Sequence, residues 1–248
     1  MIAVSVVSHG HGEMVANLVV SLLSFPEVCR ILVTLNRPES LQLPGDERIS
    51  VIHNALPKGF GANHNTAFSF CNEPFFCVVN PDIELRANPF PALLEASAKA
   101  ASAVTAPMVL SPQGTVEDSF RRFPNLRRLI VRLFGQADRS YASIPIDRGI
   151  FFPEWVAGMF MLFSSEDFAA LNGFDEKFFL YYEDVDICVR AWKSGRKVAF
   201  CPEASVVHDA RRSSHRDMRF LRWHLASMMR YFYKHWARLP EVLARTDW

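Results

Sequence analysis

Apolar runs and amphipathic stretches alternate from the first residues of the chain. Residues 2–8, 30–35, 49–53 and 75–79 are rich in β-branched and aromatic side chains and show little polar alternation, as strands do when both faces of their sheet are covered. In residues 13–24, apolar side chains recur at helical spacing. Strands that alternate with helices predict an α/β fold with a Rossmann-like, mostly parallel central sheet flanked by helices.

The second half of the chain continues this alternation less regularly. Asn88 and Pro89 have the residue types of a helix cap and of a first helical residue, and Ser164 begins a capping sequence. The other predicted elements are the helix body 92–103, the strands 103–110, 154–163, 196–200 and 204–207, and the helix 182–194, which Gly195 ends. Ligands of such sheets bind at the carboxyl ends of the strands.

Composition and cysteine usage are those of a globular protein in a reducing compartment. The 248 residues are enough for one large domain, and the net charge of +1 gives no bulk attraction to nucleic acid. The five cysteines are odd in number and form no Cys-x-x-Cys pair, which argues against disulfides and a zinc site. The N-terminus lacks the basic start of a secretory signal, and the apolar run 155–163 is too short to span a bilayer. We expect a cytoplasmic protein.

Residues 173–190 combine acidic side chains with an aromatic block. Asp175, Glu176, Glu183 and Asp184 flank the sequence Phe-Phe-Leu-Tyr-Tyr, which is too apolar for a solvated charge run. A carboxylate beside aromatic side chains loses part of its hydration, so its pKa rises toward the range that suits a general base. This stretch is therefore the first candidate for catalysis.

Helix structure offers a second explanation for the same acids. Glu183 and Asp184 would lie in the first turn of the predicted helix, where exposed backbone N–H groups favour carboxylates. Asp186 and Arg190 would lie one turn apart and could pair on its surface. Taken alone, the local pattern leaves both capping and catalysis open.

Two loops that follow predicted strands carry candidate binding chemistry. In residues 57–67, Gly59 and Gly61 precede a helix, so their backbone amides either approach a phosphate or form an ordinary turn. The sequence Asn-Pro-Asp at 80–82 ends in Asp82, a carboxylate that suits Mg²⁺ or Mn²⁺, although such sequences are also common turns.

Three histidines near these loops do not predict a metal centre. His9, His11 and His64 have no strong ligand spacing. We interpret all three as loop residues.

The stretches 59–67, 78–84 and 155–208 together resemble family 2 inverting glycosyltransferases of the GT-A fold, in particular the rhamnosyltransferase-like branch that builds bacterial surface polysaccharides. The resemblance includes the sequence Gly-Phe-Asp-Glu followed by Phe-Phe-Leu-Tyr-Tyr-Glu-Asp-Val-Asp. It implies a general base at Asp184, donor contacts at Ser8, Asn36, Gly61, Asn65, Asn80 and Asp82, acceptor contacts at Arg122, Trp155, Gly158 and Glu183, and metal ligands at Asp82 and His208.

The same resemblance implies the reaction. A divalent cation, Mg²⁺ or Mn²⁺, would assist transfer of a sugar, such as rhamnose, from a nucleoside diphosphate donor to a hydroxyl of a saccharide or lipid-linked acceptor. Many relatives carry Asp-Asn after the second strand, whereas this chain has Leu35 and Asn36, so the base, dTDP or UDP, is open. Two other hypotheses are a sugar-nucleotide or carbohydrate-binding relative without catalysis, and a sugar nucleotidyltransferase.

Basic residues gather in two segments outside these stretches. In residues 111–150, arginines follow Arg122 and predict a loop near the acceptor or a solvated face; they are Arg127, Arg128, Arg132 and Arg139. We divide the chain into a GT-A domain at 1–210 and a basic amphipathic helix at 211–248. Its apolar residues at helical spacing are Leu221, Leu225, Met228, Met229, Phe232 and Trp236. The helix either packs on the domain with a basic outer face or lies on the inner face of the plasma membrane.

Overall fold

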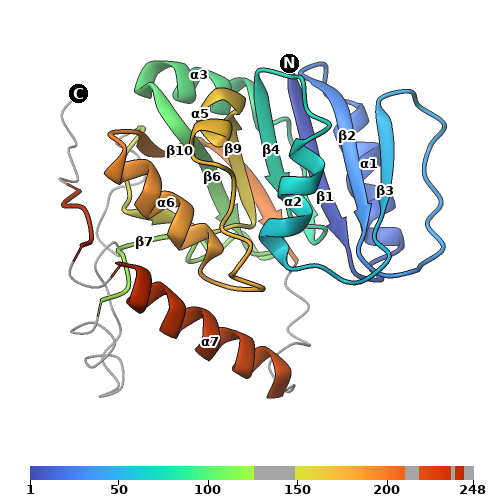
Figure 1. Cartoon of the computed structure of the whole chain (residues 1–248). Helices are drawn as coiled ribbons and strands as arrows, with labels where there is room; N and C mark the ends of the chain where they lie inside the picture. Colours follow the sequence, from blue (N-terminus) through green and yellow to red (C-terminus); the bar gives the residue numbers. More distant parts are fainter. Residues whose placement is uncertain (126–148, 210–217, 236–237, 243–248) are drawn as a thin grey trace.

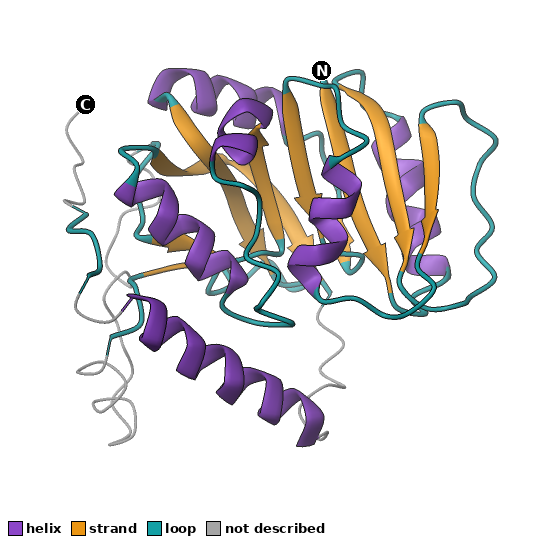
Figure 2. Cartoon of the chain, in the orientation of Figure 1, coloured by secondary structure: helices purple, strands orange, loops and turns teal. Residues whose placement is uncertain are grey.

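An eight-stranded sheet forms the centre of the protein, with helices on both of its faces (Figures 1 and 2). The computed structural model describes residues 1–125, 149–209, 218–235 and 238–242. The strands are β1 (Ile2–Ser8), β2 (Val28–Leu35), β3 (Ile49–His53), β4 (Phe75–Val79), β5 (Ile83–Glu84), β6 (Ser102–Leu110), β7 (Phe120–Arg121), β8 (Trp155–Val156), β9 (Phe160–Ser164) and β10 (Lys197–His208). The helices are α1 (Glu13–Leu23), α2 (Phe60–Phe68), α3 (Phe90–Ala100), α5 (Ser165–Ala170), α6 (Glu183–Lys193) and α7 (Met218–His235).

The sheet is mostly parallel, as the sequence predicts. Its order is β3-β2-β1-β4-β9-β6-β10-β5. Neighbours from β3 to β4 are parallel, β9 is antiparallel to β4 and β6, and β10 is parallel to β6 but antiparallel to β5. The carboxyl ends of β1, β2, β3, β4, β6 and β10 therefore share one edge, where β9 and β5 begin.

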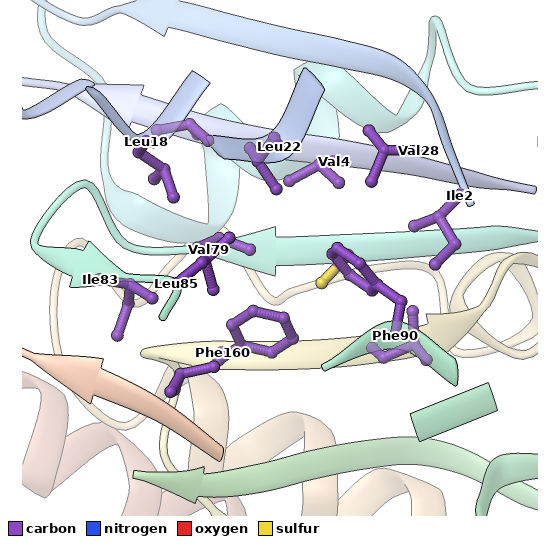
Figure 3. Packing of buried hydrophobic residues seen from close by; sticks show 14 of the residues in the cluster. Ile2, Val4, Leu18, Leu22, Val28, Val79, Ile83, Leu85, Phe90 and Phe160 are labelled. Atoms are coloured by element: carbon purple, nitrogen blue, oxygen red, sulfur yellow. The ribbon is translucent and has the colours of Figure 1, made fainter. Parts of the chain in front are cut away.

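Apolar side chains on one face of the sheet pack against α1 and α3. Figure 3 shows Leu18 and Leu22 of α1 near Val4, and Phe90 of α3 near Phe160. These side chains are at most 3% exposed. Fully burying an apolar side chain of this size stabilises the fold by roughly 1.5–3 kcal/mol, so this layer stabilises the sheet behind the site.

Aromatic side chains dominate the other face, beneath α2, α5 and α6. Phe168 of α5 packs against Phe76 and Phe163 of the sheet, with ring centroids 5.1 and 4.9 Å apart. Its ring also lies 5.5 Å from that of Phe174, which is 2% exposed. The start of the acidic and aromatic stretch is thus anchored in the core.

The structure corrects several predicted boundaries. Helix α3 ends at Ala100 because Ala101 adopts a left-handed φ of 48°, so the chain enters β6 at Ser102. The cap lies one residue later than predicted, at Pro89, although the side chain of Asn88 still accepts a hydrogen bond from the Phe90 amide. The predicted strand 154–163 is divided into β8 and β9, and the two late strands form one strand, β10, with an irregularity between 201 and 205.

Two polar residues are more deeply buried than predicted. His64 is a helical residue of α2, not a loop residue; it is 1% exposed and shares a 2.8 Å hydrogen bond with Ser5. Burial lowers the pKa of His64 to about 3, so the ring is neutral. Asp186 does pair with Arg190, but at 0% exposure the carboxylate lies in the interior rather than on the surface.

The helix predicted within residues 211–248 is present in part as α7, whereas residues 238–242 are not helical. Helix α7 lies beside α6 on the carboxyl-edge side of the sheet (Figure 1). Among the described residues, no helix is both long enough and apolar enough to cross a bilayer. All five cysteines are described and none is bonded to another.

Candidate active site

Five of the predicted site residues lie along the carboxyl edge of the sheet or in the loops that leave it. Ser8 and His208 end β1 and β10, and Asn36 and Asn80 directly follow β2 and β4. His208 pairs with Ile83 in the register of β10 and β5, and the Asp209 amide donates to the carbonyl of Asp82. The topology thus brings residues from opposite ends of the chain to one edge.

Asp184 lies in the first turn of α6 and is held by two backbone amides. Its Oδ2 accepts a hydrogen bond from Gly158 at 3.0 Å, and its Oδ1 accepts one from Val185 at 2.8 Å. Burial raises the pKa of the Asp184 carboxyl, while these hydrogen bonds and the charge of Arg121 only partly oppose the rise. A Cβ on Gly158 would lie 3.3 Å from the Phe60 ring, a tight contact that a small shift of the ring would have to relieve.

Glu183 is more buried than its neighbour. Its side chain is 5% exposed, and its Oε2 is buried without a hydrogen-bond partner. Burial, and then the charge of Asp184, raise the pKa of Glu183 well above its usual value. The environment therefore favours a neutral Glu183 beside an ionisable Asp184. The contact of Glu183 with an acceptor stays a prediction.

The loop before α6 has an unusual backbone. Tyr181 and Tyr182 have φ values of 70° and 67°, in a region that costs a non-glycine residue roughly 1–3 kcal/mol. The carbonyl of Leu180 accepts a 2.8 Å hydrogen bond from Ser227 of α7. Contacts from a distant helix thus hold a strained turn directly before the two acids.

Asn65 and Gly61 of α2 contact the start of the same loop. Asn65 accepts a hydrogen bond from the amide of Phe174 and donates to its carbonyl, both at 2.9 Å. A Cβ on Gly61 would lie 2.6 Å from the Cβ of Phe174, and one on Gly173 would lie 2.3 Å from Oδ1 of Asn65. These residues therefore position the loop, and their contact with a donor stays a prediction.

Asn36 and Ser8 are also engaged within the protein. Both are 0% exposed. Asn36 accepts hydrogen bonds from the Lys58 amide at 2.8 Å and from Asn54 at 2.7 Å, and it donates to the Lys58 carbonyl at 2.9 Å. The Ser8 hydroxyl accepts from the amide of His11 at 3.2 Å. They shape the loops that follow β1 and β3, and a direct donor contact by either remains a prediction.

Asp82, His208 and Glu117 form a line of side chains at the other end of the edge. His208 Nε2 lies 3.2 Å from Asp82 Oδ2, and His208 Nδ1 lies 2.7 Å from Glu117 Oε2. Burial opposes protonation of His208, but its hydrogen bonds with Asp82 and Glu117 raise its pKa to about 9. Glu117 was not singled out by the sequence, because nothing local distinguishes it from other loop acids.

The donor atoms of this line fit a divalent cation. Oδ1 of Asp82 is buried and has no hydrogen-bond partner, and Glu117 would hold His208 with Nε2 directed toward Asp82, as carboxylates commonly do for metal-binding histidines. Among the described residues, no three His, Cys, Asp or Glu side chains are grouped as a complete metal site. Asp82 and His208 would therefore supply two ligands, and water or phosphate oxygens the others.

The segment that precedes β9 connects the surroundings of Asp184 with the loop that carries Asp82. The Asn80 amide donates a 2.9 Å hydrogen bond to the carbonyl of Met159, and the neighbouring Gly158 amide binds Asp184. The acid of α6 and the loop that carries Asp82 thus lie on either side of residues 158–159.

The predicted acceptor residues Arg122 and Trp155 adjoin this segment. The Trp155 indole donates to the carbonyl of Arg122 at 2.9 Å, while the side chain of Arg122 is exposed. Arg121, which no sequence pattern distinguishes, lies 5.5 Å above the Trp155 ring, and its charge acts on Asp184. The predicted basic residues between Arg127 and Arg139 lie outside the described residues.

Comparisons with known proteins identify the family of this chain. The model of the family described as "Glycosyltransferase like family 2" matches residues 39–226. Rhamnosyltransferase WbbL of Escherichia coli (strain K12) is 29% identical over 93% of this chain and 92% of its own length. N-acetylglucosaminyl-diphospho-decaprenol L-rhamnosyltransferase of Mycobacterium tuberculosis (strain H37Rv) is 31% identical, but the match spans 56% of this chain and about half, 48%, of that protein.

Solved structures share the fold at low sequence identity. GalNAc-T7 with UDP, GalNAc and Mn²⁺ superposes with a TM-score of 0.66 at 14% identity, over 85% of this chain and 43% of the other. TarS residues 1–349 from S. aureus, in complex with UDP-GlcNAc, gives a TM-score of 0.58 at 12% identity, over 86% and 60% of the two chains. These likenesses confirm the predicted GT-A fold.

Proposed function

Because this chain belongs to glycosyltransferase family 2, we propose that it transfers a sugar from a nucleoside diphosphate donor to a hydroxyl group with inversion at the anomeric carbon. Family membership and the rhamnosyltransferase relatives make it a glycosyltransferase of polysaccharide synthesis. The donor, the acceptor and the stereochemistry are the parts that we propose.

The placement of Asp184 carries the proposal. Two backbone amides hold its carboxylate at the carboxyl edge, and burial raises its pKa toward the range of a general base. Asp184 would take the proton of the acceptor hydroxyl while that oxygen bonds to the anomeric carbon. The bond from this carbon to the diphosphate breaks on the opposite face, and the diphosphate leaves with the bonding electrons.

Asp82 and His208 would hold a divalent cation against the diphosphate. When bound, such a cation offsets the negative charge that develops on the leaving group. The orphaned Oδ1 of Asp82 and the facing Nε2 of His208 support this assignment. Mg²⁺ and Mn²⁺ both accept such a small set of protein ligands.

The names of the relatives narrow the range of sugar donors and acceptors that we propose. Two of them are named as rhamnosyltransferases, and one of these names a diphospho-decaprenol acceptor. We infer a deoxyhexose such as rhamnose as the sugar, dTDP or UDP as its carrier, and a saccharide or lipid-linked acceptor. The five unpaired thiols fit a cytoplasmic site of synthesis.

A thermal-shift screen tests the donor site. The melting temperatures of wild type and Asp82→Ala are measured with dTDP, UDP and their sugar derivatives, with and without Mn²⁺. A ligand at a hundred times its Kd stabilises the folded state by about 2.7 kcal/mol, so a metal-dependent rise is expected with one nucleotide and should disappear in Asp82→Ala. No rise with any nucleotide would overturn the proposal and favour a carbohydrate-binding protein.

Turnover distinguishes catalysis from binding alone. The donor that shifts the melting temperature is incubated with wild type and with Asp184→Asn, and the released nucleoside diphosphate is measured with and without a hydroxyl acceptor. Release that depends on Asp184 supports a transferase. Binding without release in the presence of candidate acceptors would support the non-catalytic alternative.

A further inference from the structure

Helix α7 packs one side against the domain and turns an apolar side outward. Its buried residues are Ser227, Tyr231 and His235. We call its exposed apolar residues the outer stripe; they are Met218, Leu221, Leu225, Met229 and Tyr233, with exposed fractions of 70, 49, 43, 64 and 91%. A helix on the surface of a globular protein normally keeps apolar side chains on its buried side, so this exposed apolar stripe on α7 is unusual.

Specific contacts hold α7 in this orientation. Asp186 of α6 is 0% exposed and lies 2.7 Å from both His235 Nε2 and Lys234 Nζ. The hydroxyl of Ser227 donates to a carbonyl of the loop before α6 at 2.8 Å, and that of Tyr231 donates to the Pro124 carbonyl at 3.2 Å. If the helix rotated, this buried carboxylate would lose the ammonium group of Lys234 and its hydrogen bond with His235.

The charge on α7 indicates what covers the outer stripe. Its sequence contains no Asp or Glu, and its basic residues are Arg219, Arg222, Arg230 and Lys234. Arg219 and Arg222 are exposed, and Arg222 lies within one turn of Met218 and Leu225. An exposed apolar stripe beside basic side chains is complementary to an anionic lipid surface. A second copy of the same helix would bring like charges together.

The position of α7 relates this surface to the active site. The helix lies on the side of the molecule toward which the carboxyl ends of β1, β2 and β4 point (Figure 1). Its inner side contacts the loop that leads to Asp184, through Ser227 and through the ring of Trp223, 4.8 Å from that of Phe179. A bilayer against the outer stripe would therefore face the edge that carries the base.

We propose that the outer stripe of α7 binds the surface of an anionic lipid bilayer and turns the carboxyl edge of the sheet toward it. The membrane contact itself stands on the geometry and charge of α7. The consequence that a lipid-linked acceptor reaches Asp184 from the bilayer rests on the proposed function.

Co-sedimentation of the full chain with vesicles tests the contact. The vesicles are phosphatidylcholine alone, or an equimolar mixture with phosphatidylglycerol, at low and high salt. Wild type is expected to bind the mixed vesicles and to be released by salt. The double substitution Leu225→Glu with Met229→Glu should weaken binding at least about tenfold, because it places two carboxylates in the apolar contact. Arg222→Gln should weaken it roughly fivefold.

The matched control is Val20→Glu on α1. Val20 is 55% exposed and apolar, but it lies on a helix that covers the opposite face of the sheet, so this variant should bind as wild type does. The proposal is overturned if wild type does not bind the mixed vesicles, if it binds both vesicle types equally, or if Val20→Glu loses binding to the same extent. Loss of a dimer on size exclusion in the double variant would assign the stripe to a second copy instead.

A second readout separates this proposal from the transferase hypothesis. The double variant changes only exposed residues, so its melting temperature and its nucleotide-dependent shift should match those of wild type. Vesicle binding without any nucleotide-dependent shift would leave the membrane contact in place and remove the transferase function. A nucleotide-dependent shift without vesicle binding would support the transferase function and overturn the membrane contact.

Discussion

Glu183 and Asp184 are consecutive acids whose surroundings give them different chemistry. Asp184 has two amide donors and Glu183 has an unpartnered, buried oxygen. Asp184→Asn should lower kcat by roughly 10²–10⁴, the usual contribution of a general base. Glu183→Gln should keep activity within about tenfold of wild type, because glutamine replaces a neutral carboxyl of similar shape. Initial-rate measurements on both variants test the assignment, which equal losses would contradict.

The pH profile of the reaction tests the same residue independently. Burial raises the pKa of Asp184 above that of an ordinary aspartate, and only its ionised form accepts a proton. Activity should therefore be complete above this raised pKa and should be lost as the pH falls through it, at a higher pH than for a solvated aspartate. An acid limb in kcat/KM that persists unchanged in the residual activity of Asp184→Asn would assign the titration to another group.

Glu117 is expected to act through His208. Its Oε2 lies 2.7 Å from Nδ1 of His208, which leaves Nε2 toward Asp82. Glu117→Ala should weaken Mn²⁺ binding in the presence of a nucleoside diphosphate by about 10–100-fold, and Glu117→Gln, which retains an acceptor oxygen, should recover part of the loss. Free Mn²⁺ is measured by electron paramagnetic resonance.

A neighbouring acid provides the control for this measurement. Glu84 is exposed and pairs with Arg86, so Glu84→Ala should bind Mn²⁺ as wild type does. Unchanged Mn²⁺ affinity in Glu117→Ala would show that Glu117 has no part in positioning the imidazole.

At the scale of elements, the site depends on how α2 and α7 hold the loop between residues 173 and 182. The amide of Phe60 donates to the Phe179 carbonyl at 2.9 Å, and Ser227 binds the next carbonyl along. Gly173 adopts a φ of 59° against Asn65, where a side chain would collide. Asn65, which the sequence predicts to contact the nucleotide, thus also packs against the loop.

Asp186 joins α6 to α7, and its loss should affect both. Burial opposes its ionisation, but the hydrogen bond from His235 and the charges of Arg190 and Lys234 outweigh this and hold the pKa of Asp186 well below its usual value. Asp186→Ala leaves its cationic partners uncompensated and should lower the free energy of unfolding by roughly 3–5 kcal/mol. Urea titrations measure this loss.

The depressed pKa also predicts how the loss depends on pH. The carboxylate of Asp186 stabilises the fold above the pKa that it has in the unfolded chain, and this contribution declines as the pH falls toward the lower folded-state value. The difference between wild type and Asp186→Ala should therefore shrink in acid. Glu166→Ala, at an exposed position of α5, should change stability by no more than about 0.5 kcal/mol; an equal loss there would remove the special role of Asp186.

At the scale of the whole molecule, the core behind the sheet and the site at its edge are separate. Leu22 is 0% exposed and Val20 is 55% exposed on the same helix. Leu22→Ala should lower the free energy of unfolding by about 2–5 kcal/mol, and Val20→Ala by no more than about 0.5 kcal/mol. Thermal and urea unfolding measure both. Each folded variant should keep its nucleotide-dependent shift, and loss of that shift in Leu22→Ala would mean that the two regions are coupled.

Local patterns predicted much of the fold. The predicted bounds of β1, β3 and β4 agree with the structure, because runs of β-branched residues are distinctive in a sheet covered on both faces. The insertion of antiparallel β9 between β4 and β6 was not predicted. Strand pairing depends on which distant segments meet, and the periodicity of one segment does not contain that information.

The sequence by itself determined the α/β class, the family and the acids at the start of α6, since these depend on local residue types and spacing. Only the tertiary structure decided that Glu117 meets His208, that the charge of Arg121 acts on Asp184, and that α7 turns an apolar stripe outward. Helical periodicity shows which side chains share a face. Which face turns inward was decided by contacts with distant residues, among them Asp186, a buried carboxylate that lies 2.7 Å from Lys234 Nζ and His235 Nε2 of α7.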